Sequence, residues 1–312
     1  GHLELTAFAR RIFPNIVNFH RFLYTYRDPL KEGLFLMYHP WESGRDNSPL
    51  WDASLERIEV APDQIPAYTR RDLHAADASH RPTDAQYDRY VYLIEMGKAF
   101  QYDGQAILEE SPFLIQDAMM NAILIKSNQS LINIGAKLGL DTGEIQEWQQ
   151  QSLTSFHDKF WHEGLQTFVP YDFVLKEQIA HWEIGGLVPI FAGISTQHQV
   201  DATCVYLRHL HERGYYLCPS FDVDSPLFDS RRYWRGPVWP QMNWMLHKGL
   251  KAYGHHDLAE LMKTDLLELV SKLGFFEYFE SQKSLVKQID QGYGGALFSW
   301  TASSVIDLIH TS

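Results

Sequence analysis

The apolar residues of this chain recur at helical spacing over most of its length. The clearest set comprises Leu258, Met262, Leu266, Leu269 and Leu273. Steps of three and four residues place these side chains on one side of an α-helix, and a similar stripe runs over residues 120–138. Because each such helix has to bury its apolar side against a neighbour, the chain is expected to fold as packed helices.

Short turns separate the helical segments and predict antiparallel helical hairpins. Gly139 ends the 120–138 stripe before another helix at 142–161, and Gly254 separates a second pair. Further helices are expected at residues 4–26, 50–58, 84–102, 197–212, 238–252 and 298–310. Pro14 should kink or break the first of these. Residues 168–175 alternate weakly, which indicates a short strand or an extended loop.

The chain shows no sign of a division into separate units. It has no linker rich in Pro, Ser and Gly, no alternation of strands with helices and no Gly-rich phosphate loop. A single all-α domain over residues 1–312 is therefore expected, with its hairpins packed as a bundle or closed into a toroid. The long loops 27–50, 219–236 and 274–299 are expected to carry function, because long irregular loops usually do.

The balance of charge argues against nucleic acid as a partner. Lys and Arg total 27 and Asp and Glu total 39, which gives a net charge of −12 that repels phosphate backbones. No apolar run approaches the ~20 residues of a membrane helix, so no membrane partner is expected. Cys204 and Cys218 lack a CxxC spacing, which favours reduced thiols and a cytoplasmic protein.

Two segments are unusually dense in aromatic and charged residues. Residues 38–52 read YHPWESGRDNSPLWD. Capping of the next helix accounts for Asn47 or Ser48, but helix propensity does not explain the density around Asp46. Residues 231–244 read RRYWRGPVWPQMNW, for which an aromatic helix start packed in the core is the structural alternative.

A third segment, residues 274–280, reads GFFEYFE and places Glu277 among four aromatic residues. Desolvation there would raise the pKa of the Glu277 carboxyl, and a neighbouring arginine would lower it. A carboxyl group in such surroundings is a candidate for acid–base chemistry.

The segments HPWESGRDNSPLWD, RYWRGPVWPQMNW and GFFEYFE…GYGGALFSWTAS, in this order, resemble glycoside hydrolase family 63. That family holds processing α-glucosidase I and the bacterial mannosylglycerate and glucosylglycerate hydrolases, and trehalases share a looser version. The resemblance covers roughly residues 30–305 and implies an (α/α)6 toroid. About ten helices are expected against the twelve of the toroid, so the first helices are interpreted as missing.

The resemblance implies the catalytic pair. The general acid is Asp46 and the general base is Glu277, 231 residues further along the chain. Hydrolysis would invert the anomeric centre, with water held by the base. The sugar would be bound by Tyr38, Trp41, Glu42, Arg45, Asn47, Trp51, Trp234, Arg235, Gly236, Trp239 and Trp300. For each tryptophan, packing in the core is an equal alternative.

The function expected is release of glucose or mannose from a small α-glycoside. The favoured substrate is glucosylglycerate or mannosylglycerate. In the sugar-glycerate hydrolases that the chain resembles, an arginine and a tyrosine shortly after the acid motif hold the carboxylate. Here the loop before the helix at 84 offers Arg81 and Tyr87, with Arg70 and Arg71 upstream. The alternative is that Arg81 is a solvated loop residue and Tyr87 a core contact. The alternatives are hydrolysis of a neutral oligosaccharide, in the manner of an α-glucosidase or trehalase, and a catalytically silent carbohydrate-binding subunit. A sugar epimerase is disfavoured because the three motifs hold a single histidine, His39.

The sequence predicts neither a cofactor nor a metal site. His209 and His211 lie two apart on an expected helix and point in different directions, which makes them a poor metal pair. The expected partner is thus a small carbohydrate, and the oligomeric state stays open.

Overall fold

The computed structural model describes residues 2–61, 63–74 and 77–310. The fold is mostly helical, as expected. Within these residues the α-helices are α1 (His2–Tyr26), α2 (Asp52–Glu56), α3 (Asp84–Ala99), α4 (Gly104–Glu110), α5 (Ala118–Leu138), α6 (Gly143–Phe160), α7 (Val188–Ala192), α8 (Gln197–Glu212), α9 (Pro240–Ala252), α10 (His256–Leu273), α11 (Lys283–Val286) and α12 (Ser299–His310).

Short strands and single 3-10 turns join the helices. The strands are β1 (Ile115–Gln116), β2 (Trp161–His162), β3 (Thr167–Phe168), β4 (Tyr171–Asp172), β5 (Glu177–Gln178), β6 (Phe276–Tyr278) and β7 (Tyr293–Ala296). They pair antiparallel in the orders β1-β4-β5, β2-β3 and β6-β7. The 3-10 helices are η1 (Pro40–Ser43), η2 (Pro49–Trp51), η3 (Asp72–His74), η4 (Ala78–His80) and η5 (Ile184–Leu187).

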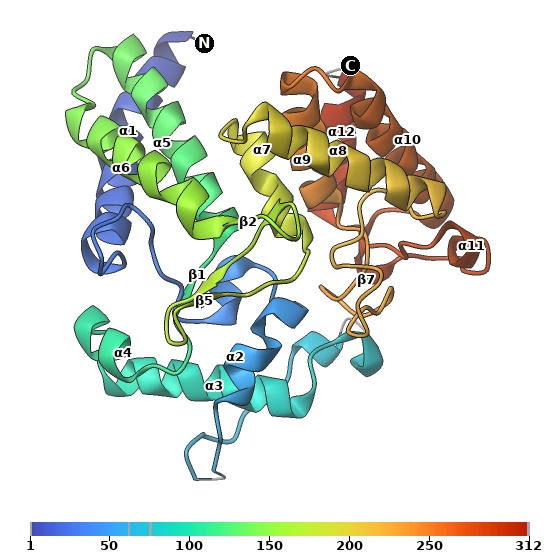
Figure 1. The fold of residues 1–312 in the computed structure, drawn as a ribbon, viewed down its shortest axis with the longest axis horizontal. Helices are drawn as coiled ribbons and strands as arrows, with labels where there is room; N and C mark the ends of the chain where they lie inside the picture. The colour runs from blue at the N-terminus through green and yellow to red at the C-terminus, as the bar shows by residue number, and fades with distance from the viewer. Residues whose placement is uncertain (1, 62, 75–76, 311–312) are drawn as a thin grey trace.

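The helices pack as an arc of hairpins. Helices α1, α5, α7, α9 and α12 contact one another in that order, while α6 packs on α5 and α10 packs on α9. Figure 1 shows this arc in the upper part of the molecule, with α2, α3 and α4 at the opposite end. The expected hairpins α5–α6 and α9–α10 are both present.

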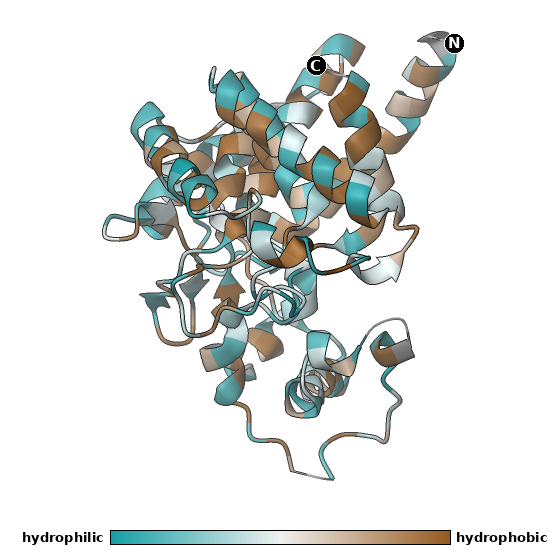
Figure 2. Cartoon of the chain, turned by 90° about the vertical axis from the view of Figure 1, so that its right-hand side faces the viewer, coloured by the Kyte–Doolittle hydropathy of each residue, from teal (hydrophilic) through white to brown (hydrophobic). Residues whose placement is uncertain are grey.

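The apolar stripes account for this packing. All five residues of the α10 stripe are buried, and Gly139 ends α5 with a φ of 65° in the left-handed region that favours glycine. Figure 2 shows hydrophobic and hydrophilic residues alternating along the packed helices, as one-sided burial requires. Among the described residues, no helix combines the length and the hydropathy needed to span a bilayer.

Most helix boundaries agree with expectation, and three expectations need correction. Helix α1 continues through Pro14, so the expected break is wrong; Phe13 and Val17, on either side of it, are buried against Leu131 and Ile145. Helices α4 and α7 were not expected, because five to seven residues are too few to show a period. The described residues also form three small sheets, and the segment 168–175 contains the end of β3 and all of β4.

Backbone pairing joins the long loops that carry the motifs. Met37 and Ile115 exchange hydrogen bonds of 2.7 and 3.1 Å, which fixes the acid motif beside β1. Val238 and Phe279 do the same at 2.8 and 3.0 Å, which fixes the second motif beside β6. Segments far apart in the sequence thereby meet at one end of the helical arc.

Candidate active site

The acid motif forms a tight turn before Asp46. Helix η1 ends at Gly44, whose φ of 67° again suits glycine. The Ser43 hydroxyl accepts a hydrogen bond from the N–H of Arg45 at 3.0 Å and donates one to the carbonyl of Pro40 at 2.7 Å. The Tyr90 hydroxyl donates to the Asp46 carbonyl at 2.8 Å. The backbone at Asp46 is therefore held from both sides.

Arg45 anchors this turn in the interior. Its side chain is 1% exposed, lies 2.6 Å from Asp117 and forms a second ion pair with Glu183. Asp117 is the N-cap of α5 and Glu183 is the N-cap of η5. Burial raises the pKa of Glu183, although Arg45 opposes the shift. One guanidinium thus joins the acid motif to the starts of two other helices.

Glu277 lies on β6, where the backbone of β7 approaches its carboxylate. The N–H of Gly295 donates to Glu277 Oε2 at 3.0 Å. Gly294 has a φ of 72°, and a Cβ there would lie against the carboxylate. Only a strand with glycine at this position can approach so closely, which explains the run Gly294-Gly295 after Tyr293.

Arg81 pairs with the Glu277 carboxylate and acts electrostatically on Asp46. Its Nη2 is 3.5 Å from Glu277 Oε2, and its guanidinium lies 4.3 Å from the centroid of the Tyr233 ring. The Tyr233 hydroxyl is in turn 3.5 Å from Glu277 Oε1. The side chain of Arg81 is buried, and its Nε has no hydrogen-bond partner among the described residues.

Asp46 has the properties of a carboxylic acid that keeps its proton. Burial raises the pKa of Asp46 to about 6, while the positive charge of Arg81 opposes the shift and the negative charges of Glu277 and Asp72 add to it. Glu277, by contrast, accepts a backbone N–H and lies beside a cation. Two carboxyls in such different surroundings can divide the acid and base roles between them.

The tryptophans of the second motif form a stack beneath this site. The rings of Trp234 and Trp239 lie 3.8 Å apart and parallel within 3°, and Trp239 also stacks on Tyr278. Trp239 Nε1 donates to the carbonyl of Tyr233 at 3.0 Å. Both tryptophans are at most 3% exposed. The stack therefore supports Tyr233, and contact of these two rings with the sugar stays a prediction.

Four more residues that are expected to contact the sugar form hydrogen bonds or ion pairs within the protein. Trp51 is fully buried and donates to the carbonyl of Arg45 at 2.8 Å. Asn47 accepts from the N–H of Trp234 at 3.0 Å, and Arg235 forms a two-pronged ion pair with Asp52. These side chains, with Arg45, contact other protein groups rather than open space. Gly236 has no room for a Cβ against the carbonyl of Asp229.

The remaining residues that are expected to bind the substrate are Trp41, Tyr87, Tyr38, Glu42 and Trp300. Trp41 is 38% exposed and contacts Tyr87 edge-on at 5.9 Å. It also contacts Tyr90, whose hydroxyl donates to the Asp46 carbonyl, so it lies near Asp46. Tyr38 lies under the Arg27 guanidinium, and Glu42 pairs with Arg27. Trp300 is 58% exposed and contacts Phe298, which lies beside Gly295.

Sequence reasoning missed Tyr233, Asp117, Glu183 and the glycines of β7. Tyr233 stands inside the second motif, and its φ of 32° marks an unusual backbone that no local pattern reveals. Asp117 and Glu183 precede helices and read as ordinary caps. Their contact with Arg45 spans 72 and 138 residues, beyond the reach of any local signal.

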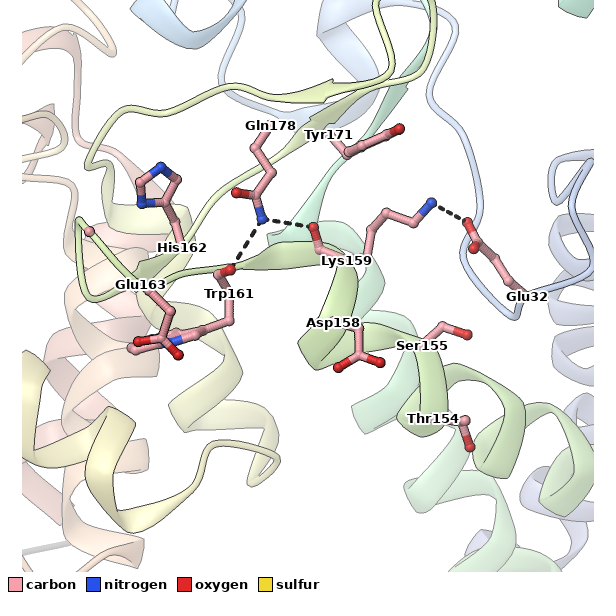
Figure 3. Close-up of a pocket in the computed structure, with 11 residues that line it drawn as sticks. Glu32, Thr154, Ser155, Asp158, Lys159, Trp161, His162, Glu163, Tyr171 and Gln178 are labelled. Carbon is pink, nitrogen blue, oxygen red and sulfur yellow. Dashed lines mark hydrogen bonds and ion pairs between the residues drawn. The ribbon is translucent and has the colours of Figure 1, made fainter.

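A cavity of about 750 Å³ lies elsewhere, between the end of α6 and the strands β2 to β5. Figure 3 shows Lys159 paired with Glu32 at 3.0 Å and the Gln178 amide donating to the carbonyls of Lys159 and Trp161. Its polar groups thus bind one another, and neither Asp46 nor Glu277 lines it. Over the described ranges, no three His, Cys, Asp or Glu side chains gather as a metal site requires.

Comparison with known proteins gives a consistent family. The family model described as mannosylglycerate hydrolase MGH1-like glycoside hydrolase domain matches residues 3–301. Mannosylglycerate hydrolase of Thermus thermophilus is 38% identical over 95% of this chain and 69% of its own length. Mannosylglycerate hydrolase MGH1 of Selaginella moellendorffii is 38% identical over 95% of this chain and 59% of its own length. Glucosylglycerate hydrolase of Mycolicibacterium hassiacum is 31% identical over 96% of this chain and 68% of its own length. The chain thus spans about 60 to 70% of these relatives.

Solved structures agree with the sequence matches. The crystal structure of a family 63 mannosylglycerate hydrolase from Thermus thermophilus, in complex with Tris and D-glycerate, superposes on the whole chain with a TM-score of 0.92 at 36% identity, and the chain covers 73% of it. Neutral trehalase from Saccharomyces cerevisiae matches 68% of this chain and 39% of its own at a TM-score of 0.50 and 14% identity, a likeness of fold alone.

The buried position of Arg45 predicts a large loss of stability on its removal. Arg45→Met leaves two buried carboxylates without a counter-charge, so we expect the free energy of unfolding to fall by about 3–5 kcal/mol. Urea denaturation measures this. The exposed pair Arg21–Glu144 provides the control, because Arg21→Met should leave the free energy of unfolding nearly unchanged. Equal losses in the two variants would show that Arg45 anchors nothing.

Proposed function

The chain belongs to the family of mannosylglycerate hydrolase MGH1-like glycoside hydrolase domains, and we propose that it hydrolyses mannosylglycerate or glucosylglycerate with inversion. The membership confirms the resemblance to glycoside hydrolase family 63 drawn from the three motifs. The observation that carries the proposal is that Arg81, which pairs with Glu277 at 3.5 Å, also acts electrostatically on Asp46; this supports one site built from loops 231 residues apart.

Asp46 acts as the general acid. It has to be protonated when the glycosidic oxygen leaves, and burial keeps its pKa near 6, so that below this pH most molecules carry the proton. Transfer of the proton to the glycosidic oxygen neutralises the leaving group as the bond to the anomeric carbon breaks. The rate should therefore fall as the pH rises through about 6.

Glu277 acts as the general base. As a carboxylate it accepts a proton from a water molecule that attacks the anomeric carbon from the face opposite Asp46. Inversion needs the two carboxyl groups about 6.5–9.5 Å apart, so that sugar and water fit between them. The N–H of Gly295, the Tyr233 hydroxyl and Arg81 fix the Glu277 carboxylate while leaving it able to face that water.

Arg81 and Tyr87 hold the carboxylate of the glycerate leaving group. A local cation is required, because the net charge of −12 disfavours an anionic substrate. The contact of Arg81 with Glu277 is long, at 3.5 Å, which leaves the guanidinium able to bind a second carboxylate. A relative in this family has been crystallised with D-glycerate, which supports a glycerate ligand here.

The architecture that surrounds this site is an (α/α)6 toroid, formed as a single catalytic domain. Two observations support this proposal. Helices α1, α5, α7, α9 and α12 follow one another in contact with α6 and α10 packed on α5 and α9, as successive hairpins of a toroid would. The likeness of fold to a trehalase, found at only 14% identity, points the same way.

The catalytic assignment is tested by removing each carboxyl group alone. Asp46→Asn and Glu277→Gln should each lower kcat on mannosylglycerate and glucosylglycerate by about 10²–10⁴-fold, because general acid and base catalysis contribute that much. Released mannose and glucose are measured against pH, and the decline above about pH 6 in the parent should vanish in Asp46→Asn.

The exposed pairs supply matched controls for this experiment. Asp257→Asn and Glu144→Gln make the same chemical changes in carboxyls that bind only surface arginines, and both should keep the parent activity. Near-normal turnover of either catalytic variant would remove that residue from its role. Parent protein that releases no sugar from either glycerate, yet cleaves a neutral α-glucoside, would instead support a trehalase-like activity.

The role of Arg81 is tested by comparing a charged with an uncharged substrate. Arg81→Ala should raise KM for the sugar-glycerate by about ten-fold or more, because hydrogen bonds to charged groups are worth roughly 1.5–3 kcal/mol. KM for an uncharged aryl α-glycoside should change little. In both cases the decline in rate should move to higher pH, since Arg81 opposes the raised pKa of Asp46. An equal rise of KM on both substrates would exclude a glycerate contact.

A further inference from the structure

A second, smaller cavity next to the acid motif is lined by three arginines. It has a volume of about 200 Å³ and contains Arg89, Arg232 and Arg235 together with Asp52 and Glu56. It adjoins the motif because Arg235 donates to the carbonyl of Asn47 at 3.3 Å, one residue after Asp46. Nothing in the proposed reaction uses it.

The positive charges in this cavity outnumber the negative ones. Arg235 is matched by Asp52, at 2.6 and 3.0 Å. Arg232 donates only to the neutral amide oxygen of Gln86 at 3.3 Å, and Arg89 to the carbonyl of Ile58 at 3.2 Å. Over the described part of the chain, neither has a carboxylate oxygen within 4.0 Å.

The excess of positive charge is unfavourable for the Arg232 side chain in particular. Its Nε is buried and has no hydrogen-bond partner among the residues that the structure describes. Burial, followed by the neighbouring charge of Arg235, lowers the pKa of Arg232, and the more distant Asp229 and Asp52 offset this only in part. A desolvated cation without a counter-charge is unfavourable, so a site of this kind gains from an anion.

The first turn of α3 lies at the cavity. Thr83, its N-cap, and Gln86 both line the cavity, so the N-terminus of a 16-residue helix adjoins it. The volume is below the ~300–1,000 Å³ of pockets that hold drug-sized ligands, and a disaccharide does not fit. The cavity therefore suits a small, compact anion.

We propose that this cavity is a binding site for a small oxyanion, inorganic phosphate or a compound of like charge and size, held by Arg232 and Arg89 at the N-terminus of α3. Such an anion joins the loop that carries Tyr233, a contact of Glu277, to the helix that carries Tyr87 and Tyr90. Its binding stabilises the folded chain by linking those two elements.

Inorganic phosphate is the probe, and thermal unfolding is the measurement, with sodium chloride at equal ionic strength as the reference. The melting temperature should rise saturably with phosphate, and titration calorimetry should give one site per chain. Neither measurement needs a glycoside, so the outcome is independent of the proposed hydrolysis. A rise with phosphate no greater than with chloride would overturn the proposal.

Variants then locate the site. Arg232→Gln and, separately, Arg89→Gln should each raise the Kd for phosphate by about ten-fold or more, because each removes a charged hydrogen-bond donor. Glu56→Gln, which removes a negative charge from the cavity, should lower this Kd several-fold. Arg208→Gln changes the net charge equally at an exposed pair with Asp257 and should leave the Kd as it is.

The set of variants keeps the test informative even if one of them does not fold. If Arg232→Gln fails to fold, Arg89→Gln and Glu56→Gln give opposite predictions for the same site. Equal phosphate affinity in Arg89→Gln, Glu56→Gln and Arg208→Gln would show that binding occurs elsewhere on the surface, and the cavity would then hold no oxyanion site.

Discussion

The buried ion pairs of Arg45 hold the candidate site together. A charge with 1% exposure is costly to desolvate, and it persists here because two carboxylates, Asp117 and Glu183, meet it at the starts of two helices. Asp46 is the next residue in the chain. Its position relative to α5 and η5, and so to the helical arc, follows from this one guanidinium. The turn closed by Ser43 and the Trp51 hydrogen bond to the Arg45 carbonyl complete the anchor.

The two carboxyl groups that we propose as catalytic have different surroundings, although Arg81 acts on both. Asp46 is desolvated, and desolvation outweighs the attraction of Arg81, so it retains its proton up to about pH 6. Glu277 receives the Gly295 N–H and lies beside Arg81, an arrangement that suits a carboxylate. Gly294 of β7, which leaves space for that approach, therefore helps to position the Glu277 carboxylate.

The sequence was informative where a local pattern determines structure, and silent where distant residues decide. The stripe of α10 and the turn at Gly139 predicted their helices, and the motifs led to Asp46 and Glu277 by family resemblance. They could not show that Trp234 and Trp239 stack on each other, because a tryptophan suits a core and a sugar equally well. Nor could they reveal the partners of Arg45, which lie up to 138 residues away.

The central claim is that a water molecule held by Glu277 attacks the anomeric carbon opposite the acid Asp46. Proton NMR during the first minutes of mannosylglycerate or glucosylglycerate hydrolysis tests it most directly, because the anomer formed first records the face of attack. The account predicts that the β-anomer of the released sugar appears first and that the α-anomer accumulates later by mutarotation. Initial release of the α-anomer would contradict it, since retention requires a covalent intermediate and carboxyls placed closer together.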